Sequence, residues 1–105
     1  MITKRQQILN LLGLAKRANK LVLGTDQTLA AIRNQTAGIV FFPKDGGVSQ
    51  AKKLRDKSVT YGSCFCQLMT RDELVTAIGI NRSVFAVADR GFTKKLRLLI
   101  EEEQQ

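Results

Sequence analysis

The chain of 105 residues contains no histidine, no tryptophan and a single proline. Histidine is the commonest general base near neutral pH and the commonest metal ligand, so its absence weighs against histidine-dependent catalysis and histidine-bound metals. No serine or cysteine lies in a nucleophile motif such as GxSxG. The sequence therefore predicts a protein that is not an enzyme and that holds no cofactor.

Cysteine is scarce as well, with only Cys64 and Cys66. Two residues apart in an expected strand, they project to the same face and cannot easily form a disulfide with each other. Two thiolates alone also do not complete a zinc tetrahedron. We expect reduced, buried cysteines that pack in the core, which is typical of a cytosolic protein.

Long apolar runs are absent, so the sequence predicts no membrane-spanning helix. An apolar segment followed by a small-residue cleavage site is also missing from the start, so no secretory signal is expected. Apolar residues make up 44% of the chain and charged residues 25%, as in ordinary globular proteins. We expect a single RNA-binding domain over residues 1–105, with a frayed acidic tail at residues 101–105.

The charge balance is unusual, with a formal net charge of +8. All nine acidic residues follow Thr25, and five basic residues precede it: Lys4, Arg5, Lys16, Arg17 and Lys20. Such a field attracts nucleic acid or anionic lipid. A solvated basic surface is the alternative interpretation, and the placement of the cations favours nucleic acid.

Helix and strand patterns alternate along the chain. Thr3 is an expected cap for a helix that runs to about Ala18, and Thr25 is expected to cap a helix that ends near Gln35. A capping box at Thr70 and Glu73 predicts a helix at residues 71–78. Further helices are expected at residues 49–57 and 92–100, with strands at 21–23, 39–42, within 59–67, and at 84–88. This order predicts an α/β fold with helices on both sides of a mixed or largely parallel sheet.

Several short motifs occur in a characteristic order: LGLAKRANKLVLGTDQT, IVFF, AIGINR and VFAVAD. In this order the sequence resembles the kink-turn-binding ribosomal protein superfamily (the L-seven-Ae and L-thirty-e proteins), and it is most similar to their small bacterial paralogues. The resemblance covers about residues 11–96. It implies a three-layer α/β/α sandwich around a mixed, about four-stranded sheet.

The resemblance also implies where RNA binds: at the helix start after the first strand and at the loop before the last strand. These positions are Gly24, Thr25, Asp26 and Gln27, and Ile80, Asn81 and Arg82. In the family, an Asn–Glu pair at this helix start contacts guanines of tandem sheared G·A pairs, and a lysine follows one turn later. This chain has Asp26 where the family usually has Asn, Gln27 where it has Glu, and Ala30 where it has the lysine. A kink-turn and a related internal loop are therefore both candidate targets.

The remaining candidate RNA-binding residues are cations expected to neutralise phosphates: Lys16, Arg17, Lys20 and Lys44. Gly24 is expected to let the backbone approach the RNA closely. Ile80 is expected to stack under an exposed base. Helix capping at Thr25 and Asp26, and simple solvation of the loop residues and the lysines, are the alternatives for these positions.

We therefore predict a monomeric, cytoplasmic, ribosome-associated protein that binds structured RNA, with ribosomal RNA as the expected target and ribosomal proteins as further candidate partners. One alternative is a substrate-binding domain related to that of RNA ribose methyltransferases, acting with a separate catalytic partner. Another is a cationic amphipathic helix at residues 1–20 lying on a membrane, which the absence of Trp and Phe from that helix disfavours.

Overall fold

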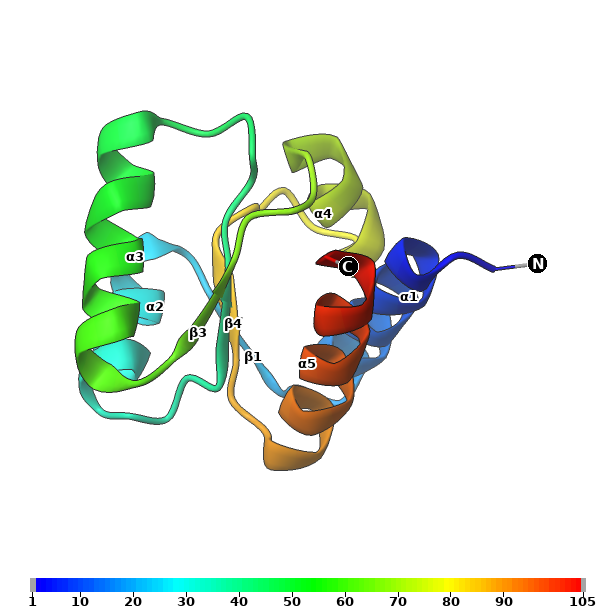
Figure 1. Cartoon of the computed structure of the whole chain (residues 1–105), viewed down its shortest axis with the longest axis horizontal. Helices are drawn as coiled ribbons and strands as arrows, with labels where there is room; N and C mark the ends of the chain where they lie inside the picture. The colour runs from blue at the N-terminus through cyan, green and yellow to red at the C-terminus, as the bar shows by residue number, and fades with distance from the viewer. Residues whose placement is uncertain (1, 105) are drawn as a thin grey trace.

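The computed structural model describes residues 2–104, which form one four-stranded sheet and five helices packed against it (Figure 1). In chain order the elements are α1 (Lys4–Arg17), β1 (Leu21–Leu23), α2 (Thr25–Arg33), β2 (Ile39–Phe41), α3 (Val48–Tyr61), β3 (Cys64–Cys66), α4 (Arg71–Ile78), β4 (Phe85–Val87) and α5 (Arg90–Gln104). Among the described residues, no helix combines the length and the apolar character that crossing a bilayer requires.

The four strands lie in the order β1-β4-β2-β3. β4 pairs antiparallel with both β1 and β2, whereas β2 pairs parallel with β3, so the sheet is mixed. α2 and α3 cover one face of the sheet, and α1, α4 and α5 cover the other (Figure 1). The predicted three-layer α/β/α sandwich is confirmed.

The central strands β2 and β4 are buried on both faces, as their unbroken apolar runs predict. Ile39 and Phe41 point into the core under α1, α4 and α5, while Val40 points into the core under α2 and α3. Phe41 stacks on Phe85 of the neighbouring strand, with the ring centroids 5.5 Å apart. Each three-residue strand therefore contributes to both cores.

Two predicted helix starts are confirmed. The hydroxyl of Thr3 accepts a hydrogen bond from the amide of Gln6 at the start of α1. At the start of α4, Thr70 and Glu73 form the expected capping box. These caps depend only on residues that are close in sequence, and local patterns predict them well.

The predicted cap at Thr25 is wrong, because the chain turns into α2 one residue earlier, at Gly24. The helix expected at residues 49–57 is also longer than predicted. α3 starts at Val48 and continues to Tyr61, where Gly62 ends it in the left-handed conformation at φ 80°. The buried hydroxyl of Ser58 donates to the carbonyl of Leu54, which accommodates a polar residue within the helix.

Residues 101–104, for which a frayed tail is predicted, continue α5 as helix, and Gln105 lies outside the described residues. α5 also starts earlier than expected, since the carboxylate of Asp89 accepts from the amide of Phe92 and Arg90 is already helical. Glu102 pairs with Lys4 of α1, with the nitrogen and oxygen 2.7 Å apart. This pair links the acidic end of α5 to the start of α1.

Candidate nucleic-acid interface

One edge of the sheet brings several loops together. Because β1 and β2 both run antiparallel to β4, and β3 runs parallel to β2, three strands end at the edge where β4 begins. The segments at this edge are residues 24–27, 42–47, 67–70 and 79–84. We refer to them together as the loop edge, which lies along the upper side of the sheet in Figure 1.

Gly24 joins the start of α2 to the loop before β4. Its amide donates to the carbonyl of Val84, with nitrogen and oxygen 2.9 Å apart. Its backbone has φ 90° and ψ 159°, a conformation that glycine adopts and other residues rarely do. No atom lies within 4 Å of where a Cβ would stand, so the backbone is open to a ligand here.

The first turn of α2 presents polar groups to solvent. Asp26 and Gln27 are both exposed, and Asp26 lies where a negative charge stabilises the helix dipole. Thr25 does not cap the helix; its hydroxyl instead accepts a hydrogen bond of 3.1 Å from the side-chain amide of Gln50 in α3. This contact ties the starts of α2 and α3 together.

Gln50 was not predicted as part of the site. The sequence indicates a helix near it, but nothing local shows that α2 and α3 start side by side. That relationship follows from the parallel directions of β1 and β2, which depend on both strands pairing with β4. Only the order of the strands in the sheet could have indicated that Gln50 lies beside Thr25.

Ile80, Asn81 and Arg82 lie in a tight turn beside Gly24. Gly79 ends α4 in the left-handed conformation at φ 77°, and the amide of Arg82 donates to the carbonyl of Ile80. Asn81 and Arg82 are exposed, whereas Ile80 is half-buried against the core. The turn therefore presents an amide and a guanidinium group next to the start of α2, and part of one apolar side chain.

Lys44 belongs to the same edge, two strands away from β1. Its amide donates to the carbonyl of Met69, and Lys44 itself is exposed. Asp45, which follows it, accepts a hydrogen bond of 2.9 Å from the amide of Arg71 at the start of α4. Lys44 is thus held on a loop that is anchored to α4.

The structure separates Lys16, Arg17 and Lys20 from the start of α2. The carbonyl of Lys20 accepts from the amide of Ala88, at the end of β1 opposite Gly24. Four residue steps along a strand span about 13 Å, so Lys20 lies about that far from Gly24. The three cations form a second cationic group at the end of α1 rather than part of the loop edge.

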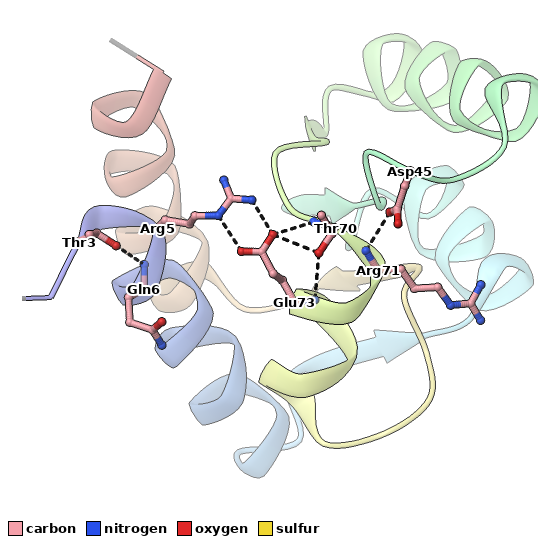
Figure 2. A network of polar contacts seen from close by, with 7 residues as sticks. All are labelled: Thr3, Arg5, Gln6, Asp45, Thr70, Arg71 and Glu73. Carbon is pink, nitrogen blue, oxygen red and sulfur yellow. Dashed lines mark hydrogen bonds and ion pairs between the residues drawn. The ribbon is translucent and has the colours of Figure 1, made fainter.

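Arg5 and Glu73 fix α4 against α1 (Figure 2). The guanidinium group of Arg5 donates to both carboxylate oxygens of Glu73, with 2.7 Å between Nε and Oε2. The hydrogen bonds from Arg5, followed by those from Thr70, lower the pKa of Glu73 from its ordinary 4.5 to about 2. Arg5 is therefore a structural cation, unlike Lys16 and Arg17 at the end of α1.

The prediction of buried cysteines is confirmed for Cys66, whereas Cys64 is only half-buried. Both are free thiols, and both lie on the face of β3 that meets the core under α1, α4 and α5. Burial raises the pKa of Cys66 to about 11, so its thiol stays protonated near neutral pH. No cluster of three or more His, Cys, Asp or Glu residues suited to a metal occurs in residues 2–104.

Comparison with known proteins gives the family. The model of the ribosomal protein L7Ae/L30e/S12e/Gadd45 family matches residues 6–97. The chain belongs to this family. The membership that the motifs indicate is therefore confirmed.

Two relatives are named RNA-binding protein YlxQ. The one from Enterococcus faecium is 44% identical over 97 residues, which cover 92% of this chain and 94% of the relative. The one from Bacillus subtilis (strain 168) is 40% identical over 92 residues, covering 87% and 92%. The names of these relatives describe RNA-binding proteins and not enzymes, in agreement with the sequence prediction.

Solved structures share the fold. A protein of unknown function from Bacillus halodurans C superposes with a TM-score of 0.86 at 38% identity, covering 90% of this chain and 97% of that one. The Giardia lamblia 15.5kD RNA binding protein superposes with a TM-score of 0.81 at 12% identity, covering 99% and 91%. At that low identity the second likeness shows the fold alone.

Proposed function

We propose that the chain binds structured RNA through the loop edge, with the start of α2 and the turn at residues 79–84 as the two halves of the interface. The observation that carries the proposal is the hydrogen bond between Gly24 and Val84, because it joins the start of α2 to the loop that carries Asn81 and Arg82. Membership of the family and the names of the two relatives support the same partner class.

The exposed groups suit the edges of bases. A guanine presents N1–H and N2–H₂ donors, and the carboxylate of Asp26 and the amide oxygen of Gln27 are acceptors. Arg82 and Asn81 supply donors on the other side of Gly24. Unpaired or sheared bases offer these edges, so the proposed target is a kink-turn or a similar internal loop.

Cations at two places would hold the phosphates. Lys44 lies on the loop edge. Lys20 lies about 13 Å from Gly24, at the other end of β1, and Lys16 and Arg17 precede it at the end of α1. A nucleic-acid duplex carries a charge about every 1.7 Å of its axis, so about eight phosphates fall within that distance. The second group would therefore contact the flanking backbone while the loop edge contacts bases.

Ribosomal RNA is the proposed target, and the ribosome in the cytoplasm the proposed place of action, because the family includes ribosomal proteins. Ribosomal proteins are then candidate neighbours of the bound chain. RNA crosslinked to the protein in its own cell would identify the target directly.

Gel-shift titration tests the proposal. A kink-turn RNA, a plain hairpin of equal length and a tRNA would each be titrated over a series of salt concentrations. The proposal expects tighter binding to the kink-turn RNA than to the hairpin, and a difference that persists as salt rises, since base contacts are less sensitive to salt than phosphate contacts. Equal affinity for all three RNAs at every salt concentration would contradict it.

A further inference from the structure

α3 carries an excess of positive charge that no described contact neutralises. Its basic residues are Lys52, Lys53, Arg55 and Lys57, and its only acidic residue is Asp56. Within residues 2–104, the ion pairs join α1 to α5 and α1 to α4, and none includes a residue of α3. The other basic helices differ, because Lys4 and Arg5 of α1 form ion pairs and α5 also carries three glutamates.

The side chains of α3 divide into faces. Ala51, Leu54 and Ser58 are buried against the sheet, and the guanidinium of Arg55 lies 5.9 Å from the ring centroid of Phe65. Lys53 and Lys57 follow Gln50 at the spacing of three and seven residues, which places all three on one stripe of the helix. Because Gln50 bonds to Thr25, that stripe lies on the side of α2.

Lys53 and Lys57 also lie alongside α2. The two helices start together at the loop edge, cover the same face and pack on each other (Figure 1). At 1.5 Å per residue, Lys53 and Lys57 stand about 4.5 Å and 10 Å beyond Gln50 along α3. α2 contributes no net charge of its own, since Asp26 offsets Arg33.

We propose that Lys53 and Lys57 form a second phosphate-binding surface, which extends the RNA interface from the start of α2 along the paired helices and contacts the backbone of one helical arm of the RNA. This inference rests on the proposed function for its partner class. Lys53 is exposed and Lys57 is half-buried, and ammonium groups contact phosphates and not base edges, so this contact does not depend on the sequence of the RNA.

The test compares two double variants of equal charge change. Lys53→Gln/Lys57→Gln removes the proposed surface, and Lys94→Gln/Lys95→Gln removes two exposed cations of α5 on the other face of the sheet. Each protein is titrated against an RNA with a kink-turn between two arms and against a plain RNA duplex, over a series of salt concentrations. Thermal melts check that both variants fold.

The expected result is a change in salt dependence. Loss of two phosphate contacts on a duplex arm lowers the slope of log affinity against log salt by about 1.8 and weakens binding about tenfold at low salt, for both RNAs. The α5 variant keeps the wild-type slope. Equal changes in both variants, which would indicate net charge alone, or no change in the α3 variant would overturn the inference.

Arm length locates the contact. When either arm is shortened from about ten base pairs to about three, phosphates beyond the kink-turn are lost from that side alone. The α3 variant should then match the wild type on one shortened RNA and remain weaker on the other. If the proposed function fails, the wild type binds the kink-turn RNA and the plain duplex with equal affinity. The salt slope of the α3 variant on the duplex still tests the inference in that case.

Discussion

The amide of Gly24 donates to the carbonyl of Val84 across 2.9 Å, and this contact holds the start of α2 beside the loop before β4. The two segments are far apart in sequence and meet because β1 and β4 are antiparallel neighbours. An interface that contacts a ligand from both segments depends on this pairing, and thus on the backbone conformation of Gly24.

Gly24→Ala should lower the free energy of unfolding by about 1–3 kcal/mol, because an alanine at φ 90° is strained although nothing blocks its Cβ. Gly47→Ala is the matched control, since Gly47 also precedes a helix without a side-chain cap but has φ −64°. Its effect should stay within about 1 kcal/mol. Urea denaturation measures both, and equal losses would show that the backbone of Gly24 is not special.

Gln27→Ala and Lys16→Ala should separate base contacts from phosphate contacts. Gln27→Ala should cost about 1–3 kcal/mol on the preferred RNA only, and Lys16→Ala should weaken all RNAs similarly and lower the salt slope. Both variants are scored by titration against the kink-turn RNA and the plain hairpin. If Gln27→Ala weakened both RNAs equally, the start of α2 would not contribute specificity.

Glu73→Gln should reduce stability in a pH-dependent way. The pKa of Glu73 falls from 4.5 to about 2 on folding, so its stabilisation is complete above about pH 5 and is lost as pH falls toward 2. Because the side chains of Arg5 and Glu73 are 30% and 28% exposed, we expect about 1–2 kcal/mol at pH 7 after allowing for solvent screening.

Asp72→Asn is the control for that experiment, since Asp72 is exposed in the same helical turn and shares any effect of the helix dipole. Chemical denaturation from pH 7 to pH 2 follows both variants. The difference between Glu73→Gln and the wild type should shrink as the pH approaches 2. A constant difference over that range would mean that the ion pair with Arg5 is not its source.

Thr28→Val should stabilise the protein by about 1 kcal/mol, because the buried hydroxyl of Thr28 has no hydrogen-bond partner among the described residues. Valine keeps the shape and removes the unsatisfied group. Thr28→Ser keeps the hydroxyl and removes a methyl group, so it should destabilise instead. Thermal unfolding ranks the three proteins, and a loss of stability in Thr28→Val would show that the hydroxyl is satisfied.

Local features of the fold could be predicted from the sequence. The caps at Thr3 and Thr70 and the buried apolar runs of β2 and β4 all depend on neighbouring residues or on short periodic patterns. The motif order also gave the family. These signals suffice for the layers of the sandwich.

Features that depend on distant residues could not be predicted. Lys20 precedes Gly24 closely in sequence, yet the intervening strand places them at opposite ends of β1. The contact between Thr25 and Gln50 requires the sheet order, and the continuation of α5 through residue 104 requires its packing on α1. The pairing of strands and helices, rather than propensity, determines these relationships.

The first and last helices lie side by side on the face of the sheet that α2 and α3 leave uncovered, where the ion pair between Lys4 and Glu102 links them (Figure 1). A fluorophore, an affinity tag or a sensor-chip tether fused at either end would therefore sit behind the sheet, away from α2 and α3. A short peptide joining both ends would likewise permit a circularly permuted version with new ends cut into an exposed loop.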